Sequence, residues 1–160
     1  MAKKITRWAA TLVPAMATAG LLLTGTAAAQ PSAPAVATGH RVQIYEIWYN
    51  SPGPDHGSNS SLNHEWVRLN NTSGSNISLK GWTLHDAAGH TFTFPAYTLG
   101  ALSHVKIRTG RGTNNQDSLY WGRNWYIWNN NGDTATLSDS SGGTVDSCRY
   151  NGTSAEHVFC

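Results

Sequence analysis

The sequence has few charged residues, and their distribution leaves almost no net charge. Only 12% of its 160 residues are Asp, Glu, Lys or Arg. Three of the eleven basic residues lie in the first seven positions, so eight basic residues remain against nine acidic ones. A near-neutral chain lacks the electrostatic field that concentrates proteins on nucleic acid or anionic membranes. The charge balance therefore disfavours nucleic acid as a partner.

The sequence motifs of common enzymes are also absent. There is no G-x-S-x-G and no H-E-x-x-H, and the glycine-rich stretch 110–113 lacks the lysine of a phosphate-binding loop. The sequence therefore predicts a non-catalytic protein that needs no cofactor. A small metal-dependent secreted hydrolase and a purely structural envelope protein remain as alternatives. DNA binding stays open only through a local basic face, formed by Arg68, Lys106, Arg108 and Arg111.

Long apolar runs are missing except for one near the N-terminus, at residues 8–23. Lys3, Lys4 and Arg7 precede this run, and an A-x-A site at residues 27–29 follows it. This order predicts a secretory signal peptide over residues 1–29, a mature N-terminus at Gln30 and a secreted, extracellular protein. The run is short for a membrane span, and an anchored N-terminal helix is the less favoured alternative. Residues 30–39 are rich in proline and alanine and predict a flexible leader.

Cysteine is scarce, with only Cys148 and Cys160 in the chain. Secreted chains with an even number of cysteines usually pair them, so we expect a disulfide between these two residues. The bridge closes a loop of about 13 residues, which contributes about 3 kcal/mol in the chain-entropy treatment. It would fasten the C-terminus to the last strand.

After residue 40 the sequence has no helical periodicity and shows short runs of alternating apolar and polar residues. Val67 and Leu69 alternate with polar or bulky neighbours, and three further runs repeat the pattern near residues 92, 105 and 135. A period of two places apolar side chains on one face of a strand, as in half-buried antiparallel sheets. Seven or more such strands separated by turn residues predict an all-β, two-sheet antiparallel β-sandwich.

Two breaks in this alternation predict local irregularities. Ile44 and Ile47 are three residues apart, which indicates a β-bulge near Tyr45 or Glu46. Gly81 stands where the apolar phase changes, which indicates a bend. The predicted core consists of Ile44, Val67, Leu69, Leu79, Trp82, Leu84, Phe92, Phe94, Val105, Ile107 and Leu137.

Two adjacent motifs resemble the lamin tail domain family. The first is a glutamate-led strand ending in asparagine, at residues 65–71, and the second is an L-x-G-W-x-L stretch that ends in aspartate, at residues 79–86. Phe92-Thr93-Phe94-Pro95, Trp128-Asn129-Asn130 and Gly132-Asp133 follow in the family's order, so the resemblance covers about residues 40–150. One departure is Ala101-Leu102-Ser103-His104, where such proteins usually place glycine.

This resemblance implies an immunoglobulin-like fold and a non-catalytic module over residues 40–160. The chain looks like the secreted bacterial version, in which the domain stands alone behind a signal peptide. The implied partner is an extracellular protein or a cell-wall polysaccharide. The family's Glu65, Gly81, Trp82 and Asp86 are expected to have structural roles.

The most unusual stretch of the sequence is aromatic, with five large rings within residues 120–128. On a strand, Trp125 and Trp128 would point to opposite faces, so both cannot enter one core. We therefore expect at least one ring to be more than a third exposed and to contact a ligand. The candidate binding residues are Trp121, Arg123, Asn124, Trp125, Tyr126 and Trp128. The alternative is a loop that buries its rings against the edge of the sandwich.

Two weaker patterns suggest metal ions. Residues 50–65 are rich in oxygen-bearing side chains, which suits calcium, although the EF-hand spacing fails. The candidate calcium ligands are Asp55, Asn59, Asn63 and Glu65. His85, Asp86 and His90 could surround zinc, but the chain has no Cys/His spacing typical of a tetrahedral zinc site.

Overall fold

The computed structural model describes residues 41–152 and 155–160, and the predicted signal peptide and leader lie outside these ranges. The described chain is almost entirely β-structure, because its alternating segments all form strands and only one short helix interrupts them. In order, the elements are β1 (Val42–Trp48), α1 (Asn59–Leu62), β2 (Trp66–Asn71), β3 (Ile77–Ser78), β4 (Thr83–His85), β5 (Thr91–Thr93), β6 (Thr98–Leu99), β7 (His104–Arg108), β8 (Ser118–Tyr120), β9 (Gly132–Ser138), β10 (Thr144–Asn151) and β11 (His157–Phe159).

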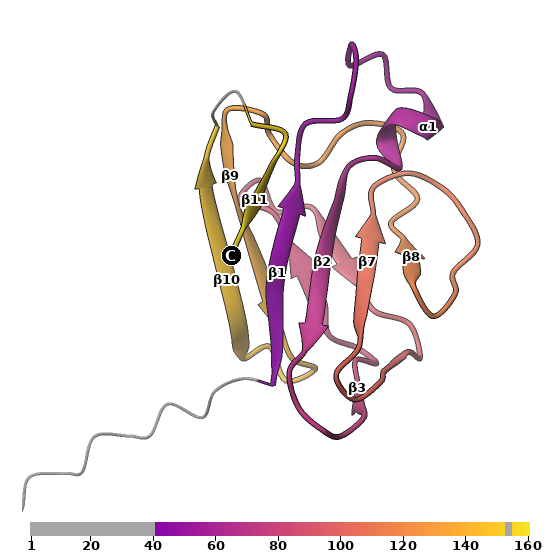
Figure 1. Ribbon diagram of the computed structural model, residues 1–160, viewed down its shortest axis with the longest axis vertical. Coiled ribbons are helices and arrows are strands. Elements are labelled where there is room, and N and C mark those ends of the chain that lie inside the picture. The colour runs from indigo at the N-terminus through magenta and orange to yellow at the C-terminus, as the bar shows by residue number, and fades with distance from the viewer. Residues whose placement is uncertain (1–40, 153–154) are drawn as a thin grey trace, which may run out of the picture. The chain divides into compact units, whose positions relative to one another are not determined.

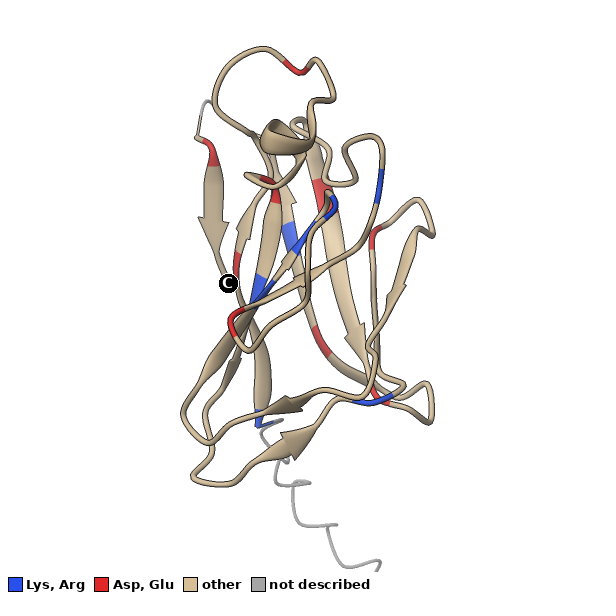
Figure 2. Cartoon of the chain, turned by 90° about the vertical axis from the view of Figure 1, so that its right-hand side faces the viewer, with Lys and Arg blue, Asp and Glu red and all other residues tan. Residues whose placement is uncertain are grey.

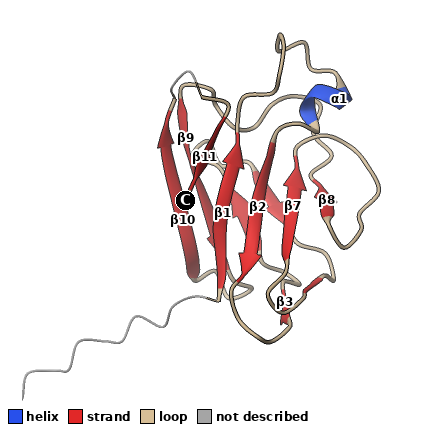
Figure 3. Ribbon diagram, in the orientation of Figure 1, coloured by secondary structure: helices blue, strands red, loops and turns tan. Residues whose placement is uncertain are grey.

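Two sheets form the sandwich, which confirms the predicted fold class (Figures 1 and 3). One sheet has the strand order β11-β1-β2-β7-β8 and the other has the order β10-β9-β4-β5, while β3 and β6 pair separately. All pairings are antiparallel except that of β7 with β8, which is parallel. The parallel pair follows from the loop at residues 109–117, which carries the chain back before it forms β8.

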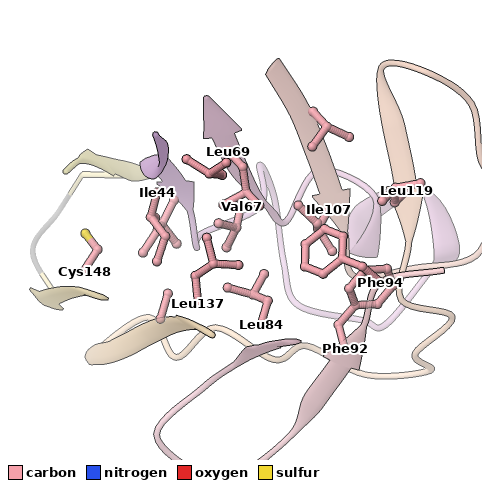
Figure 4. Packing of buried hydrophobic residues seen from close by; sticks show 14 of the residues in the cluster. Ile44, Val67, Leu69, Leu84, Phe92, Phe94, Ile107, Leu119, Leu137 and Cys148 are labelled. Carbon is pink, nitrogen blue, oxygen red and sulfur yellow. The ribbon is translucent and has the colours of Figure 1, made fainter. Parts of the chain in front are cut away.

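The core lies between the two sheets and is built by the period-two alternation. Val67 and Leu69 on β2 are fully buried, and the polar neighbour Arg68 is only half-buried on the other face. Figure 4 shows these two side chains facing Leu84 and Leu137 from the opposite sheet. Ten of the eleven predicted core residues are buried, namely Ile44, Val67, Leu69, Leu79, Leu84, Phe92, Phe94, Val105, Ile107 and Leu137.

Trp82 is the exception, and the prediction that it fills the core is wrong. Its side chain is half-buried and packs against the edge of the core cluster. The reason is that the chain turns between β3 and β4, where the Trp82 amide donates to the Leu79 carbonyl at 2.9 Å. Gly81 supplies the left-handed conformation of this turn, with φ of +78°. Trp82 therefore precedes β4 and is not one of its inward-facing positions.

The predicted bulge in β1 is confirmed. The register between β1 and β2 shifts between Ile44 and Glu46, so Tyr45 is the additional residue. Tyr45 is 41% exposed as a result, while Ile44 and Ile47 both stay in the core. The bulge thus explains how two apolar residues three positions apart reach the same face.

The turn after β6 shows the consequence of the missing glycine. Leu102 has φ of +53° and is the one non-glycine residue of the described chain in the left-handed region. Its amide donates to the Ser73 carbonyl at 3.0 Å, and Asn76 accepts a hydrogen bond from the Ala101 amide. These contacts hold the leucine in a conformation that glycine adopts more readily.

The predicted disulfide is confirmed, with a Cys148–Cys160 S–S distance of 2.01 Å. Cys148 lies on β10 of one sheet, and Cys160 directly follows β11, which pairs with β1 of the other sheet. The bridge therefore joins the edges of the two sheets. The Cys160 amide also donates to the Tyr45 carbonyl at 3.0 Å, so the C-terminal strand is fastened on both sides.

Candidate functional site

Three irregular segments meet at one end of the sandwich. They are the loop after β1, helix α1 with its flanks, and the long loop at residues 121–131 between β8 and β9 (Figure 1). Helix α1 begins at its N-cap Ser58, whose hydroxyl accepts from the Ser61 amide, and Leu62 anchors it because that side chain is buried. The candidate binding residues of the sequence analysis lie in the 121–131 loop.

The rings of the 121–131 loop divide into buried and exposed ones. Trp128 is 1% exposed, and Trp121 is half-buried with its ring centroid 5.7 Å from that of Phe92. Trp125 is 61% exposed, which confirms that at least one ring reaches the surface. The segment is a loop and not a strand, so Ile127 and Trp128 can both be buried although they are neighbours. The aromatic stretch therefore contains both exposed and buried rings.

The exposed ring of Trp125 packs closely against Gly57. A Cβ atom on Gly57 would lie 2.7 Å from the Trp125 ring, and Gly57 has φ of +69°, so both space and backbone require glycine there. Tyr126 makes an edge contact with Trp125 and is itself held by a 2.7 Å hydrogen bond between its hydroxyl and that of Ser61. The Trp125 side chain is thus seated on a fixed loop with most of its surface open to solvent.

Two cavities share Trp125 as a wall. The smaller, of about 240 Å³, is lined by Asp55, Asn129 and Asn130 together with residues 125–128. The larger, of about 420 Å³, is lined by His90, residues 122–124 and residues 125–127. In the smaller cavity, Asn130 Nδ2 donates to Asp55 Oδ2 at 3.0 Å. Polar groups that can donate and accept hydrogen bonds therefore flank an exposed aromatic ring on both sides.

Arg123 and Asn124 have different environments within the larger cavity. Arg123 Cζ lies 5.8 Å from the Trp121 ring centroid, and its Nε is buried without a hydrogen-bond partner. Asn124 is exposed, and its Oδ1 accepts a hydrogen bond from Arg111 Nη2. The structure thus places every predicted binding residue in or beside this loop, but Trp128 belongs to the core.

The four candidate calcium ligands do not converge. Asn59 and Asn63 meet at Arg111, where both amide groups donate to its carbonyl at 3.0 Å. Asp55 is exposed beside Asn130, and Glu65 is fully buried. Within residues 41–152 and 155–160 no group of three His, Cys, Asp or Glu side chains is placed to hold a metal ion.

Glu65 connects the start of β2 to the loop of the candidate site. Its Oε1 accepts from the Thr109 hydroxyl at 2.7 Å and from the Ile127 amide at 2.8 Å, while Oε2 has no partner. Burial raises the pKa of Glu65 to about 8, although these two hydrogen bonds favour the charged form. Glu65 therefore holds the 121–131 loop through the Ile127 amide and, being buried, takes no part in the exposed surface.

Asp86 and His90 form a polar pair at the rim of the larger cavity. His90 Nδ1 lies 2.6 Å from Asp86 Oδ2, and the His90 amide donates to Asp86 Oδ1 at 2.7 Å. Asp86 is buried, as expected for a residue that satisfies turn amides. His85 instead directs its Nδ1 to the Asp86 carbonyl at 3.1 Å, so the two histidines do not share the carboxylate.

A second aromatic group, missed by the sequence analysis, lies on the outer face of the five-stranded sheet. This outer-face ring group consists of Trp48, Trp66 and His157. The rings of Trp48 and His157 are stacked 4.7 Å apart, and Trp48 lies 5.7 Å from Trp66. Lys106 Nζ stands 3.8 Å from the Trp66 centroid. The three rings come from distant parts of the chain. In the sequence, only the alternation of Trp66 with Val67 indicated that the Trp66 ring lies on the outer face of its strand.

Three of the four residues of the proposed local basic face, Arg68, Lys106 and Arg108, lie on the outer side of β2 and β7, where Arg68 pairs with Lys106. Arg68 and Lys106 face each other on β2 and β7, but each lies over an aromatic ring, Tyr45 and Trp66 respectively. Figure 2 shows basic and acidic positions interspersed over one side of the domain.

No helix of the described chain is long and apolar enough to cross a membrane.

Comparison with protein families gives one result that covers most of the chain. The sequence profile of the Lamin Tail Domain family matches residues 35–152. Comparison with curated protein sequences gives no match. The matched range includes the strands of both sheets up to β10 and all three segments of the candidate site.

Proposed function

Because the chain belongs to the lamin tail domain family, whose members share a non-enzymatic immunoglobulin-like fold, we propose that it is a secreted, non-catalytic module that binds a polysaccharide outside the cell. Binding takes place at the 121–131 loop, with Trp125 at its centre. Trp125 carries this proposal, since it is 61% exposed and lines two cavities.

The chemistry around Trp125 suits a sugar ring. One face of a pyranose consists of C–H groups, which pack on an aromatic surface, while its edge carries hydroxyl groups. Trp125 offers a large contact area with only two side-chain torsions to immobilise. Asp55, Asn129 and Asn130 on one side and Asn124 on the other supply acceptors and donors for hydroxyl groups. A mostly aromatic surface with a few fixed polar groups is typical of small-ligand sites.

The proposed secretion is supported by the N-terminal sequence pattern and by the disulfide. A bridge between Cys148 and Cys160 forms and persists in oxidising compartments. Expression of the full chain in a secreting bacterial host, followed by mass spectrometry of the medium, tests this part. The expected N-terminus is Gln30, and recovery of an intact segment 1–29 on the secreted protein would contradict the proposed cleavage.

A glycan array probed with the secreted protein, followed by calorimetry on the glycans that bind, tests the binding site. Trp125→Ala should weaken binding by about 1 kcal/mol or more, which is at least about fivefold. Phe159→Ala is the matched control, because Phe159 is also 61% exposed but lies on β11, on the outer-face side. Equal binding by the wild type and Trp125→Ala would move the site elsewhere.

The other functions considered have distinct signatures in the same experiments. Tight binding of one calcium ion with ordering of the 50–65 loop would support a metal-dependent hydrolase. Capture of a single extracellular protein that depends on Trp125, with no glycan bound, would favour a protein partner. Retention in the cell envelope without any ligand would favour a structural role.

A further inference from the structure

Arg123 is a cation without a counter-ion. Across residues 41–152 and 155–160, its guanidinium makes no hydrogen bond and no ion pair, and the contact with the Trp121 ring is its one polar interaction. Its Nε is buried, so water does not replace the missing partner there. Because Nε is closed off and the residue as a whole is half-buried, the terminal amino groups of Arg123 are the donors that a ligand can reach.

The position of Arg123 is well defined by its backbone. The Arg123 amide donates to the Thr109 carbonyl at 2.9 Å, and the preceding Gly122 amide donates to the Gly110 carbonyl at 2.9 Å. Two consecutive hydrogen bonds therefore fasten this part of the loop to the segment that follows β7. The side chain projects from a fixed base and lines the larger cavity.

His90 lines the same cavity and contributes a second nitrogen-bearing group. Its Nδ1 is engaged by Asp86, whose two carboxylate oxygens both accept hydrogen bonds from His90. Nε2 has no partner in the part of the chain that the structure describes. The Asp86 side chain is fully buried and already occupied by His90, so it does not compete for Arg123.

From these observations we propose that the larger cavity binds the carboxylate of an acidic sugar, with Arg123 as the anchoring residue and Trp125 packing against the sugar ring. The proposal rests on the polysaccharide-binding function and names the class of its ligand, a uronic-acid-containing glycan. A planar guanidinium with several donors matches a carboxylate in a bidentate arrangement. His90 lines the same cavity, where Nε2 can contact the anion or a neighbouring hydroxyl.

A carboxylate fits this cavity better than the backbone of a nucleic acid. Binding of single-stranded nucleic acid needs a basic groove that follows several phosphates. The larger cavity has one arginine and no lysine among its lining residues, and the adjoining smaller cavity contains Asp55. The lining contains one cation, Arg123, beside one exposed ring, which corresponds to one acidic group on one sugar unit, while Arg111 is bonded to Asn124 of the lining.

The test uses matched pairs of oligosaccharides, namely oligomers of galacturonate, glucuronate and mannuronate and their methyl esters. Each ester keeps the hydroxyl groups of its acid and removes the charge. The secreted wild-type protein should bind at least one acid about tenfold more tightly than its ester. Arg123→Gln should remove this preference by weakening the binding of the acid alone. Arg123→Lys should restore part of the preference, because lysine returns the positive charge but not the planar pair of donors that the guanidinium offers.

Arg149→Gln is the control for net charge, since Arg149 is exposed on β10 and lines a different cavity. It should leave the preference for the acid unchanged. Melting temperatures of all variants show whether each is folded, and the chemical shifts of the Arg123 Nη–Hη groups in the wild type report contact with the ligand. Those signals should move with the acid and stay in place with the ester.

The outcomes separate this inference from the function on which it rests. Equal affinity for acids and esters, or an equal loss in Arg123→Gln and Arg149→Gln, would overturn the acidic-sugar proposal and leave polysaccharide binding intact. Failure to bind any acidic or neutral glycan would overturn both. Binding of an oligothymidylate that depends on Arg123, with no preference among the sugars, would assign the cavity to nucleic acid and also overturn the proposal.

Discussion

The outer-face ring group and Trp125 are both aromatic and both lie outside the core, but they differ in how far neighbouring side chains cover their rings. In the outer-face ring group, His157 and Trp66 cover Trp48, while Lys106 stands over Trp66. Trp125 packs against Gly57 and the edge of Tyr126 and stays 61% exposed. Rings that cover one another stabilise the sheet, whereas an uncovered ring is available to a ligand.

This difference shows that the number of aromatic residues does not identify a binding surface. Trp128 belongs to the same segment as Trp125 but is 1% exposed, and its ring lies 6.0 Å from that of Trp121. The relevant property is the uncovered area of each ring, which depends on what the rest of the chain places against it. The side-chain replacements below test the division into covered and uncovered rings, from the largest expected effect to the smallest, and one further prediction concerns the pH dependence of stability.

Trp128→Ala should have the largest effect on stability, because it removes a fully buried ring from the core. The expected loss is about 3–5 kcal/mol, which would unfold a domain of ordinary stability. Urea denaturation monitored by circular dichroism measures it. A loss below about 1 kcal/mol would mean that Trp128 belongs with the exposed rings.

Replacing both cysteines by serine should destabilise the protein by about 3 kcal/mol, because the unfolded chain regains the freedom of the closed loop. Strand β11 carries His157, so the outer-face ring group should loosen as well. Denaturation gives the free energy, and amide hydrogen exchange reports the loosening of β11. Unchanged protection of residues 157–159 would show that the strand pairing alone holds them.

Trp48→Ala should cost about 2 kcal/mol, since it removes two ring contacts and the partial burial of one large side chain. Glycan binding should remain at the wild-type level, because Trp48 lies on the sheet face and not at the candidate site. Denaturation and calorimetry on the same variant measure the two effects. Loss of binding without loss of stability would place the ligand on the outer face instead.

The stability of the protein should depend on pH through Glu65, which lies beneath the loop of Trp125. Burial raises its pKa from 4.5 to about 8, so the folded state holds a proton that the unfolded state has lost between these pH values. The free energy of unfolding should therefore fall as pH rises from about 4.5 to about 8, by at most about 1.4 kcal/mol per pH unit, and then level off.

Glu65→Gln is the control for this pH dependence, because the amide resembles the protonated carboxyl group and does not titrate. Its oxygen can still accept from Thr109 and Ile127. The difference in unfolding free energy between the variant and the wild type should change in favour of the variant as pH rises. A constant difference from pH 4 to pH 9 would contradict a raised pKa.

Trp125→Ala should have the smallest effect on stability, below about 0.5 kcal/mol, since an exposed side chain contributes little to the folded state. The same variant should lose glycan binding, as proposed above. Thermal unfolding measures the first effect. A loss of more than about 2 kcal/mol would show that Trp125 is a covered ring and would remove the main reason to place a site there.

Much of the fold could be predicted from local sequence. Alternation identified ten core residues correctly, because the period of two is a property of each strand by itself. The spacing of Ile44 and Ile47 predicted the bulge for the same reason. The prediction that Trp82 fills the core was wrong, because the turn at Gly81 places Trp82 before β4 and outside the alternation of that strand.

The candidate site was predictable only in part. The density of rings in residues 120–128 pointed to the correct loop, but it did not separate Trp125 from Trp128. That separation depends on Gly57, which is 68 residues away from Trp125 and keeps space for its ring. Asn59 and Asn63 were predicted as calcium ligands from composition alone, and the sequence did not reveal that their side-chain amides donate to the Arg111 carbonyl.

The sequence by itself determined the strands, the family and the cysteine pair, because periodicity, ordered motifs and residue counts are local or cumulative properties of the chain. The tertiary structure alone decided which rings are covered, that Arg123 has no counter-ion among the described residues and that Glu65 is buried beneath the loop. Each of these depends on segments that are far apart in the sequence and adjacent in space. Exposure and charge pairing are relations between such segments, so no single stretch of residues contains them.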